Sequence, residues 1–308
     1  FLPDVDLPRG IVAQTDALAA ATGKDVIVLA VPSPFLMGVV RRILSAPNVM
    51  EGESLVVVLT KGFIGGPHGP RLIVEALEEH LPGFYGGNVV YLSGPSHAAE
   101  VARGRITGLA AASANGLNAI RVRELFRGSH VLVFPSLDSV GVQVCAATKN
   151  VVAIAFGMLD ALAGAEGRSE AFGYNTESLL LAAGLNEMQS IGRSLGATHA
   201  ETFTSLAGVG DLDVTCRYLQ GRNRRFGREI IQKRILEPFR DIDDLLARLG
   251  EIGYLPEGAV AVKHVAQIAA AKRLDLPIML GVHEILDRKV EPLEFLESYL
   301  GSLGASGT

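Results

Sequence analysis

The arrangement of apolar residues along the chain changes near residue 137. Before that point, continuous apolar runs of strand length alternate with stretches of helical periodicity. Strands are predicted at 26–31, 55–60, 89–92, 108–112 and 131–134, and helices at 35–44, 71–80 and 117–126. Runs that are apolar throughout are typical of parallel strands covered by helices on both faces. The first half is therefore predicted to be α/β, with a doubly wound, mostly parallel sheet.

The second half contains no further strand-like runs. Its apolar residues recur at three- and four-residue spacing, which indicates amphipathic helices. These helices are predicted at about 139–163, 174–195, 199–207, 222–233, 241–249, 257–273, 277–286 and 292–299. We therefore expect two domains, a sheet domain over 1–137 and an all-helical domain over 138–308. Asp211 and Arg222 are expected between helices.

The amino end lacks one expected motif. A doubly wound sheet that binds a dinucleotide carries Gly-x-Gly-x-x-Gly after its first strand. None follows the first predicted strand here, and the chain begins with Phe1 instead of methionine. We therefore expect a Rossmann-like domain that is incomplete at its amino end, without its first βαβ unit of roughly 30 residues.

Lys149 lies within 144–155, an almost wholly apolar helical stretch. A buried ammonium group loses hydration, so it must be paired, reach a polar cleft or titrate nearer neutrality. Such a lysine is a candidate general acid and base. The alternative is a helix-end lysine whose ammonium group extends to water.

Three polar residues downstream suggest a second part of a site. Asp211 lies among small and apolar residues and requires a cationic or hydrogen-bonding partner if buried. Arg222 and Asn223 offer a planar guanidinium and an amide, which together suit a phosphate or a polyol. The alternative for the basic run 222–225 is a solvated turn.

Ligands of doubly wound sheets bind beyond the carboxyl ends of the strands. The residues that follow the predicted strands are Pro32 and Ser33, then Lys61, then Gly94 and Ser96. Each has an ordinary alternative as a surface lysine or a turn residue. Their common position at strand ends favours a shared crevice.

Composition excludes several classes of protein. The 308 residues include 28 basic and 33 acidic side chains, a net charge of −5, so no basic excess indicates binding to nucleic acid or to an anionic membrane. The seven histidines and two cysteines show no metal-binding spacing, so no metal site is predicted. Cys145 and Cys216 lie in apolar segments, which favours buried, reduced thiols and a cytoplasmic location. Charge, glycine or proline interrupts the apolar runs before they reach bilayer length, so no membrane insertion is expected.

Several short motifs occur together in a specific order. They are Ala30-Val31-Pro32-Ser33, Thr60-Lys61-Gly62, Ser93-Gly94-Pro95-Ser96-His97-Ala98, Lys149-Asn150-Val151, Gly208-Val209-Gly210-Asp211-Leu212, Arg222-Asn223-Arg224-Arg225-Phe226-Gly227 and Pro256-Glu257-Gly258. With these motifs the chain resembles the NAD(P)-dependent glycerol-3-phosphate dehydrogenases over most of its length.

The resemblance implies an oxidoreductase that transfers a hydride between NAD or NADP and the pair dihydroxyacetone phosphate and sn-glycerol 3-phosphate, for phospholipid synthesis. It implies that Lys149 accepts the proton when the alcohol is oxidised and donates it when the ketone is reduced. Lys61 and Asp211 would complete the catalytic group. The phosphate end of the substrate would meet Arg222 and Asn223.

The resemblance also implies a cofactor side. The positions that would contact substrate are Lys61, Gly94, Ser96, Lys149, Asp211, Arg222 and Asn223. Positions that would contact cofactor are Ala98, Leu255, Glu257, Pro32 and Ser33, with Lys61 and Arg222 shared between the two ligands. The family further suggests a cytoplasmic homodimer whose partner is a small phosphorylated molecule.

Two departures from the family pattern keep alternatives open. Gly221 stands where the family commonly has serine, and Leu181-Ala182-Ala183-Gly184 stands where it usually has Thr-Arg-Gly. One alternative is a related β-hydroxyacid or 2-ketopantoate reductase. Another is a catalytically inactive remnant that binds a phosphorylated polyol.

Overall fold

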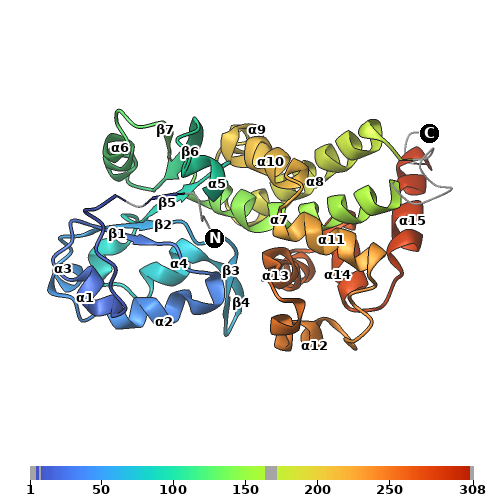
Figure 1. The fold of residues 1–308 in the computed structure, drawn as a ribbon, viewed down its shortest axis with the longest axis horizontal. Coiled ribbons are helices and arrows are strands. Elements are labelled where there is room, and N and C mark those ends of the chain that lie inside the picture. Colours follow the sequence, from blue (N-terminus) through green and yellow to red (C-terminus); the bar gives the residue numbers. More distant parts are fainter. Residues whose placement is uncertain (1–4, 7, 164–171, 306–308) are drawn as a thin grey trace.

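A computed structural model describes residues 5–6, 8–163 and 172–305 of the chain. A sheet with its helices forms one side of the molecule, and a bundle of helices forms the other (Figure 1). The long helix α7, Ser139–Ala163, runs from the sheet into the bundle (Figure 1). The proposed boundary at 137/138 falls between the last strand and this helix, and it stays a prediction.

The main sheet has five strands in the order β1-β2-β5-β6-β7. Their bounds are β1 Val26–Leu29, β2 Leu55–Val58, β5 Val90–Ser93, β6 Thr107–Ala112 and β7 Val131–Ser136. Every neighbouring pair is parallel except β5 and β6, which are antiparallel. The predicted mostly parallel sheet is therefore confirmed.

Helices cover both faces of this sheet. Val56 and Val58 of β2 pack into one apolar cluster with α2, Ser33–Ile43, and α4, Ile73–Glu78. The alternate residues of β2 pack into a second cluster with α6, Gly116–Leu125. Short helices complete the domain, namely α1 Ala17–Ala21, α3 Pro47–Met50, a 3-10 turn Gly83–Tyr85 and α5 Ala98–Val101. The doubly wound arrangement follows from this alternation of sides.

Two strands are less buried than their apolar sequences suggest. Val28 of β1 and Leu132 and Phe134 of β7 are about half exposed, at 55 %, 50 % and 51 %. Both strands lie at edges of the sheet that the described residues form, so each pairs with a single strand. The expectation that all five strands are covered on both faces is therefore wrong for the two edge strands.

The predicted helix at 71–80 begins too early. Residues before it form an antiparallel hairpin of β3, Phe63–Gly66, and β4, Gly69–Leu72, so α4 begins only at Ile73. Pro67 between the two strands, and Gly66 and Gly69 at the strand ends, favour the tight turn. The hairpin reaches across to the helical half, where the ring of Phe63 meets His264 edge-on with centroids 6.2 Å apart.

The helical half consists of α7, α8 Tyr174–Ser194, α9 Glu201–Thr204, the π-helical turn η2 Leu206–Gly210, α10 Asp211–Arg217, α11 Arg222–Gln232, α12 Ile242–Ala247, a 3-10 turn Leu249–Ile252, α13 Glu257–Lys272, α14 Pro277–Leu286 and α15 Pro292–Ala305. Asp211 and Arg222 are each the first residue of a helix, so the prediction that they lie between helices is wrong. The short α10 was not predicted, because it spans only seven residues.

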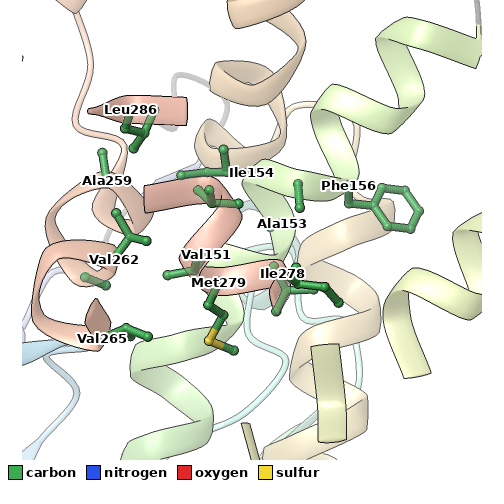
Figure 2. Packing of buried hydrophobic residues seen from close by; sticks show 14 of the residues in the cluster. Val151, Ala153, Ile154, Phe156, Ala259, Val262, Val265, Ile278, Met279 and Leu286 are labelled. Carbon is green, nitrogen blue, oxygen red and sulfur yellow. The ribbon is translucent and has the colours of Figure 1, made fainter. Parts of the chain in front are cut away.

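Helix α7 is the centre of the helical core. Val151 and Ile154 pack against Val262 of α13 and Ile278 of α14 (Figure 2). By length and composition α7 could cross a membrane, yet its most apolar 18-residue window is completely buried by the rest of the protein. It is thus the core helix of this fold.

Glycines allow α11 to approach α7 closely. A Cβ at Gly227 would lie 2.1 Å from the carbonyl oxygen of Ile154, and one at Gly157 would lie 2.1 Å from that of Arg224. Neither position has space for a side chain. The close crossing fixes the start of α11 relative to Lys149 of α7.

A carboxylate holds the start of α7 in place. Asp138 is buried, and its Oδ1 accepts hydrogen bonds from the backbone of Gly141 at 2.9 Å and of Thr198 at 3.2 Å. Its Oδ2 accepts one from the hydroxyl of Thr202 at 2.7 Å. A capping acid at a helix amino end satisfies free N–H groups and complements the helix dipole. Here it also joins α7 to the segment before η2.

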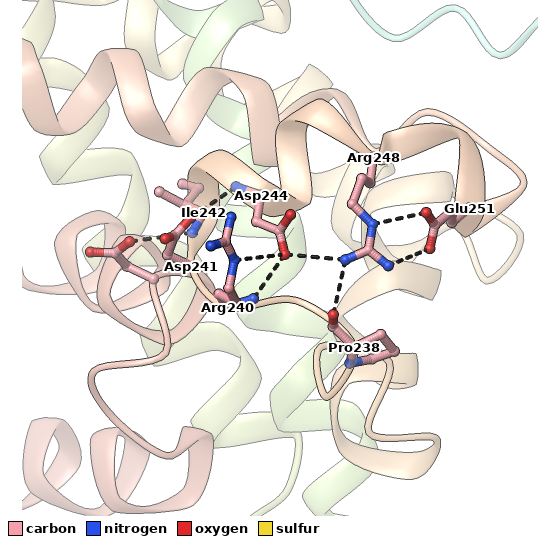
Figure 3. Close-up of polar contacts among 8 residues, drawn as sticks. Pro238, Arg240, Asp241, Ile242, Asp244, Arg248 and Glu251 are labelled. Carbon is pink, nitrogen blue, oxygen red and sulfur yellow. Dashed lines mark hydrogen bonds and ion pairs between the residues drawn. The ribbon is translucent and has the colours of Figure 1, made fainter.

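A polar network closes the outer end of the bundle. Asp241 caps α12 by accepting from the backbone of Asp244 at 2.8 Å. Arg248 then binds Asp244, Glu251 and the carbonyl oxygen of Pro238 (Figure 3). These contacts order the connection between α11 and α13.

Candidate functional site

The two halves of the protein enclose a polar cavity of about 430 Å³. Its floor is formed by residues that directly follow β1 and β2, the position where ligands bind in doubly wound sheets. Its lining residues are Ala30, Val31, Pro32, Leu59, Thr60, Lys61, His97, Lys149, Asn150, Thr215, Tyr218, Gln220, Gly221, Arg222, Asn223 and Glu257. Lys149 and Arg222 thus open onto one shared space.

Lys149, which lines this cavity, is paired with two residues of α10. Its Nζ donates to Oδ1 of Asp211, and it donates to Oγ1 of Thr215 at 2.8 Å. The Thr215 hydroxyl donates in turn to the backbone carbonyl of Asp211 at 2.6 Å. All three side chains are buried. The expectation that Lys149 needs a partner is met by a carboxylate and a hydroxyl one helical turn apart.

Lys61 reaches the same carboxylate from the sheet domain. Its Nζ lies 3.1 Å from Oδ2 of Asp211. The Lys61 side chain is 22 % exposed, whereas that of Lys149 is 6 % exposed. One carboxylate therefore holds two ammonium groups, and the one on the sheet side keeps more contact with solvent.

The pKa values of the three groups follow from burial and mutual charge. Burial lowers the pKa of Lys149 to about 7, since the attraction of Asp211 only partly offsets desolvation and the Lys61 ammonium opposes a second charge. Burial also acts on Lys61, but Asp211 and neighbouring groups outweigh it and raise the pKa of Lys61. Burial alone would raise the pKa of Asp211, and the two ammonium groups outweigh it and lower that pKa. Of the three groups, Lys149 is therefore the one whose pKa lies nearest neutral pH.

Another part of the cavity wall is formed by the start of α11 and the start of α13. Arg222 is 55 % exposed at its side chain, and its Nη2 lies 3.4 Å from Oε1 of Glu257. The backbone N–H of Gly258 donates to Oδ1 of Asn223 at 2.8 Å. Asn150, next to Lys149, donates to Oε2 of Glu257 at 3.3 Å. A weakly held guanidinium and a capped helix start thus face the cavity.

Two predicted cofactor positions lie in a narrow crevice beside the cavity. Ser33 and Leu255 line this crevice together with Lys61 and Glu257, which also belong to the main cavity. Pro32 lines the main cavity itself. In the described ranges, no group of three or more histidine, cysteine or acidic residues is arranged to hold a metal ion.

Family models match nearly the whole chain. The model of the NAD-dependent glycerol-3-phosphate dehydrogenase N-terminus matches residues 1–119, and that of the C-terminus matches residues 138–297. The chain belongs to the NAD-dependent glycerol-3-phosphate dehydrogenase family. This match favours the family named from the motifs over the β-hydroxyacid and 2-ketopantoate reductases.

Individual relatives agree with this membership. The chain is 54 % identical over 310 aligned residues to a glycerol-3-phosphate dehydrogenase [NAD(P)+] of Treponema pallidum, an alignment that covers 98 % of this chain and 86 % of that protein. It is 52 % identical to the enzyme of the same name from Treponema denticola, with 97 % and 85 % covered. A solved glycerol-3-phosphate dehydrogenase from Coxiella burnetii superposes with a TM-score of 0.81 at 30 % identity and covers 97 % of this chain and 84 % of its own. The α/β fold followed by a helical domain is therefore that of glycerol-3-phosphate dehydrogenases.

Gly94, Ser96 and Ala98, taken from the glycerol-3-phosphate dehydrogenase pattern, line neither the cavity nor the crevice in the described chain. Asp211 is not a lining residue either, and it reaches the cavity through its contacts with Lys149 and Lys61. Gly94 has φ +146°, and a Cβ there would lie 2.9 Å from the carbonyl oxygen of Gly108 and 2.8 Å from Leu206. The glycine is thus required for packing of η2 on β6. Ser96 donates to the Gly94 carbonyl at 3.0 Å. Ligand contacts of these residues stay predictions.

The two departures from the glycerol-3-phosphate dehydrogenase pattern have different positions. Gly221 lines the cavity and precedes α11 as its N-cap, without a side chain to cap the helix. Residues 181–184 lie in α8, away from the lining of the cavity in the described residues, and Gly184 packs on Val152 of α7. The first departure changes the wall of the site, and the second changes the core of the helical domain.

Sequence reasoning missed several residues of the cavity wall, among them His97, Asn150, Thr215 and Tyr218. Thr215 follows Asp211 by four residues, so both lie on one face of α10, and this spacing would have identified Thr215 had the helix been predicted. Asn150 is adjacent to Lys149, and His97 lies within the motif Ser93-Gly94-Pro95-Ser96-His97-Ala98. No signal in the sequence indicates Tyr218.

Proposed function

We propose that this chain catalyses reversible hydride transfer between NAD(P)H and dihydroxyacetone phosphate, with sn-glycerol 3-phosphate as the reduced product. The observation that carries the proposal is the pairing of Lys149 with Asp211 and Thr215, where Lys149 lines a cavity that Arg222 also lines. A proton-exchanging amine and an anion-binding guanidinium then face the two ends of a small phosphorylated ketone.

Lys149 is proposed as the acid and base of the reaction. With a pKa of about 7, it holds and releases a proton under ordinary conditions. In alcohol oxidation, the neutral amine takes the proton of the secondary hydroxyl group. In ketone reduction, the ammonium group returns a proton to the carbonyl oxygen. A nicotinamide dinucleotide, when bound, supplies or takes the hydride.

Asp211 and Lys61 are proposed to prepare the reacting end. Asp211 fixes both lysine amines through its two carboxylate oxygens and offsets their charge. The raised pKa of Lys61 keeps this amine an ammonium group, so it donates a hydrogen bond to the oxygen on which negative charge develops. In this proposal Lys149 transfers the proton, and Lys61 stabilises the developing negative charge.

The phosphate end is proposed to lie at the start of α11. Arg222 has only one long contact among the described residues, with Glu257, which leaves its guanidinium available for a bidentate contact with phosphate. Oδ1 of Asn223 is used by Gly258, which leaves its amide N–H₂ group for donation to a ligand. The amino end of the eleven-residue α11 also has N–H groups without a side-chain cap. Such groups favour a bound anion.

The cofactor is proposed to lie along the carboxyl ends of β1 and β2. Pro32 and Ser33 follow β1, and Lys61 follows β2 at the same edge. Leu255 and Glu257 approach this edge from the helical domain and share the adjoining crevice with Ser33 and Lys61. These residues would hold the nicotinamide end of NAD or NADP, because an apolar side chain would suit the ring and a carboxylate would accept a hydrogen bond from its amide.

A turnover assay tests the proposed function. The purified full chain, with NADH or NADPH and dihydroxyacetone phosphate, is expected to oxidise the cofactor, measured by loss of its near-ultraviolet absorbance. Lys149→Met is expected to lower kcat by at least about 100-fold. Glycerol 3-phosphate binding by calorimetry without turnover in the wild-type chain would instead support the inactive binding protein.

Three further properties are proposed from the resemblance alone. They are a homodimer, a cytoplasmic location and a role in supplying glycerol phosphate for phospholipid synthesis. Sedimentation of the purified chain tests the first of them, since a monomer across micromolar concentrations would contradict a dimer.

A further inference from the structure

His97 and Tyr218 form a bridge between the two domains at the wall of the cavity. His97 is the N-cap residue of α5 in the sheet domain, and Tyr218 follows α10 in the helical domain. Their rings are stacked, with centroids 4.0 Å apart and planes inclined by 29°. Both residues line the cavity that contains Lys149. The stack therefore holds an imidazole at a fixed place beside the reacting end.

The imidazole has unused hydrogen-bonding capacity. Its Nε2 is buried, and within the described chain it has no hydrogen-bond partner of normal geometry. An unsatisfied buried nitrogen costs free energy, and such atoms in native proteins are uncommon. A polar group of a bound ligand would remove that cost.

The charge of this ring is set by its surroundings. Burial is the largest effect and lowers the pKa of His97, and the ammonium groups of Lys149 and Lys61 lower it further. A backbone contact with Val214 and the carboxylate of Asp211 act in the opposite direction and are outweighed. The ring is thus neutral near pH 7, with one nitrogen that donates and one that accepts.

A neutral donor and acceptor suits one group of the substrate better than the others. This step rests on the proposed function, in which Arg222 and Asn223 meet the phosphate while Lys149 and Lys61 meet the reacting oxygen. The remaining polar group of dihydroxyacetone phosphate and of glycerol 3-phosphate is the terminal hydroxyl. A hydroxyl group also donates once and accepts, so it matches a neutral imidazole.

We propose that His97 hydrogen-bonds the terminal hydroxyl group of the substrate and thereby selects three-carbon phosphates that carry this hydroxyl. The stack on Tyr218 holds the ring in position, so Tyr218 is a positioning residue. His97 acts on substrate choice and leaves the proton exchange to Lys149.

A pair of substrates tests the proposal directly. Acetol phosphate differs from dihydroxyacetone phosphate only by lacking the terminal hydroxyl group. We expect wild-type enzyme to prefer dihydroxyacetone phosphate by about tenfold in kcat/KM, the size of a neutral hydrogen bond. His97→Phe retains an aromatic ring for the stack but has no ring nitrogen. It is expected to lose this preference by becoming worse on dihydroxyacetone phosphate and to act on acetol phosphate about as well as wild type.

Other outcomes overturn the proposal. An equal loss on both substrates would mean that His97 only supports the fold, and absence of preference in the wild-type enzyme would contradict the proposal without any variant. Tyr218→Phe is the matched control, and it should retain the preference because its ring still stacks. Calorimetric affinity for glycerol 3-phosphate provides a readout without turnover. The wild-type chain could bind glycerol 3-phosphate, with about tenfold weaker binding in His97→Phe, and still transfer no hydride. That result would contradict the proposed function and keep the inference on His97.

Discussion

Nζ of Lys149 lies 2.8 Å from Oγ1 of Thr215, and this hydroxyl donates onward to the backbone of Asp211. The Thr215 hydroxyl hydrogen is thus already used, which orients an oxygen lone pair toward the lysine. This lone pair accepts a hydrogen bond from the Lys149 ammonium group and fixes the direction in which Nζ points. We therefore expect the titration of Lys149 to determine the pH dependence of the reaction.

The first prediction concerns pH. Alcohol oxidation requires the neutral amine of Lys149, so its kcat/KM should rise as pH increases through about 7, the pKa of Lys149. Ketone reduction requires the ammonium form, so its kcat/KM should fall over the same range. Initial rates in both directions between pH 5.5 and 9, roughly two units on either side of the transition, measure this. Profiles that move in the same direction would exclude Lys149 as the titrating group.

The second prediction concerns Asp211→Asn. The carboxylate raises the pKa of Lys149 against burial, so its removal should move the profile of ketone reduction to lower pH by about one unit or more. Activity at pH 8 should fall accordingly. Asp213→Asn is the control, since Asp213 lies on the same helix but pairs with exposed Arg217. A normal profile for Asp211→Asn would show that the carboxylate does not set this pKa.

The third prediction concerns the phosphate end. Arg222→Ala should raise KM for dihydroxyacetone phosphate about 10- to 100-fold, the value of charge-assisted hydrogen bonds, with a smaller effect on kcat. Arg222→Lys should restore only part of the affinity, because an ammonium group lacks the planar fork. Arg225→Ala serves as comparison, because both side chains are 55 % exposed but Arg225 pairs with Glu229. Equal effects of both alanine variants would point to general charge instead of a specific contact.

The fourth prediction concerns stability. Gly227→Ala places a methyl group against the backbone of α7, 2.1 Å from the carbonyl oxygen of Ile154. Forcing the helices apart should lower the free energy of unfolding by about 1–3 kcal/mol, measured by urea titration. Gly250→Ala has nothing within 4 Å of the added carbon and should leave stability nearly unchanged. If the two variants unfold at the same urea concentration, the crossing is looser than described.

Much of the fold follows from local pattern. The bounds of α7, α8, α13 and α14 agree with the predicted helices to within a residue or two, because long amphipathic or buried helices have strong periodicity. The hairpin of β3 and β4 was missed because glycine and proline dominate its eight strand residues. Helix α10 was missed because it is short and follows a π-helical turn. Neither element carries a long enough pattern to be distinguished from a loop.

The site was only partly accessible to the same reasoning. A buried lysine and a buried aspartate each require a partner, so the chemistry of Lys149 and Asp211 could be expected before their contact was known. Their pairing joins residues 62 positions apart and depends on how α10 crosses α7. The stack of His97 on Tyr218 joins two domains and has no local signature. Contacts of this kind become visible only when the tertiary structure is described.

Asn223 accepts the backbone hydrogen bond of Gly258, and the residues beside these two are Arg222 and Glu257. These contacts connect the first turn of α11 to the first turn of α13. A shift of the start of α11 toward a bound anion would therefore pull on the start of α13, which carries the predicted contacts to the dinucleotide. The hydrogen bond on this one amide oxygen is thus a direct connection between the predicted phosphate end and the predicted cofactor side.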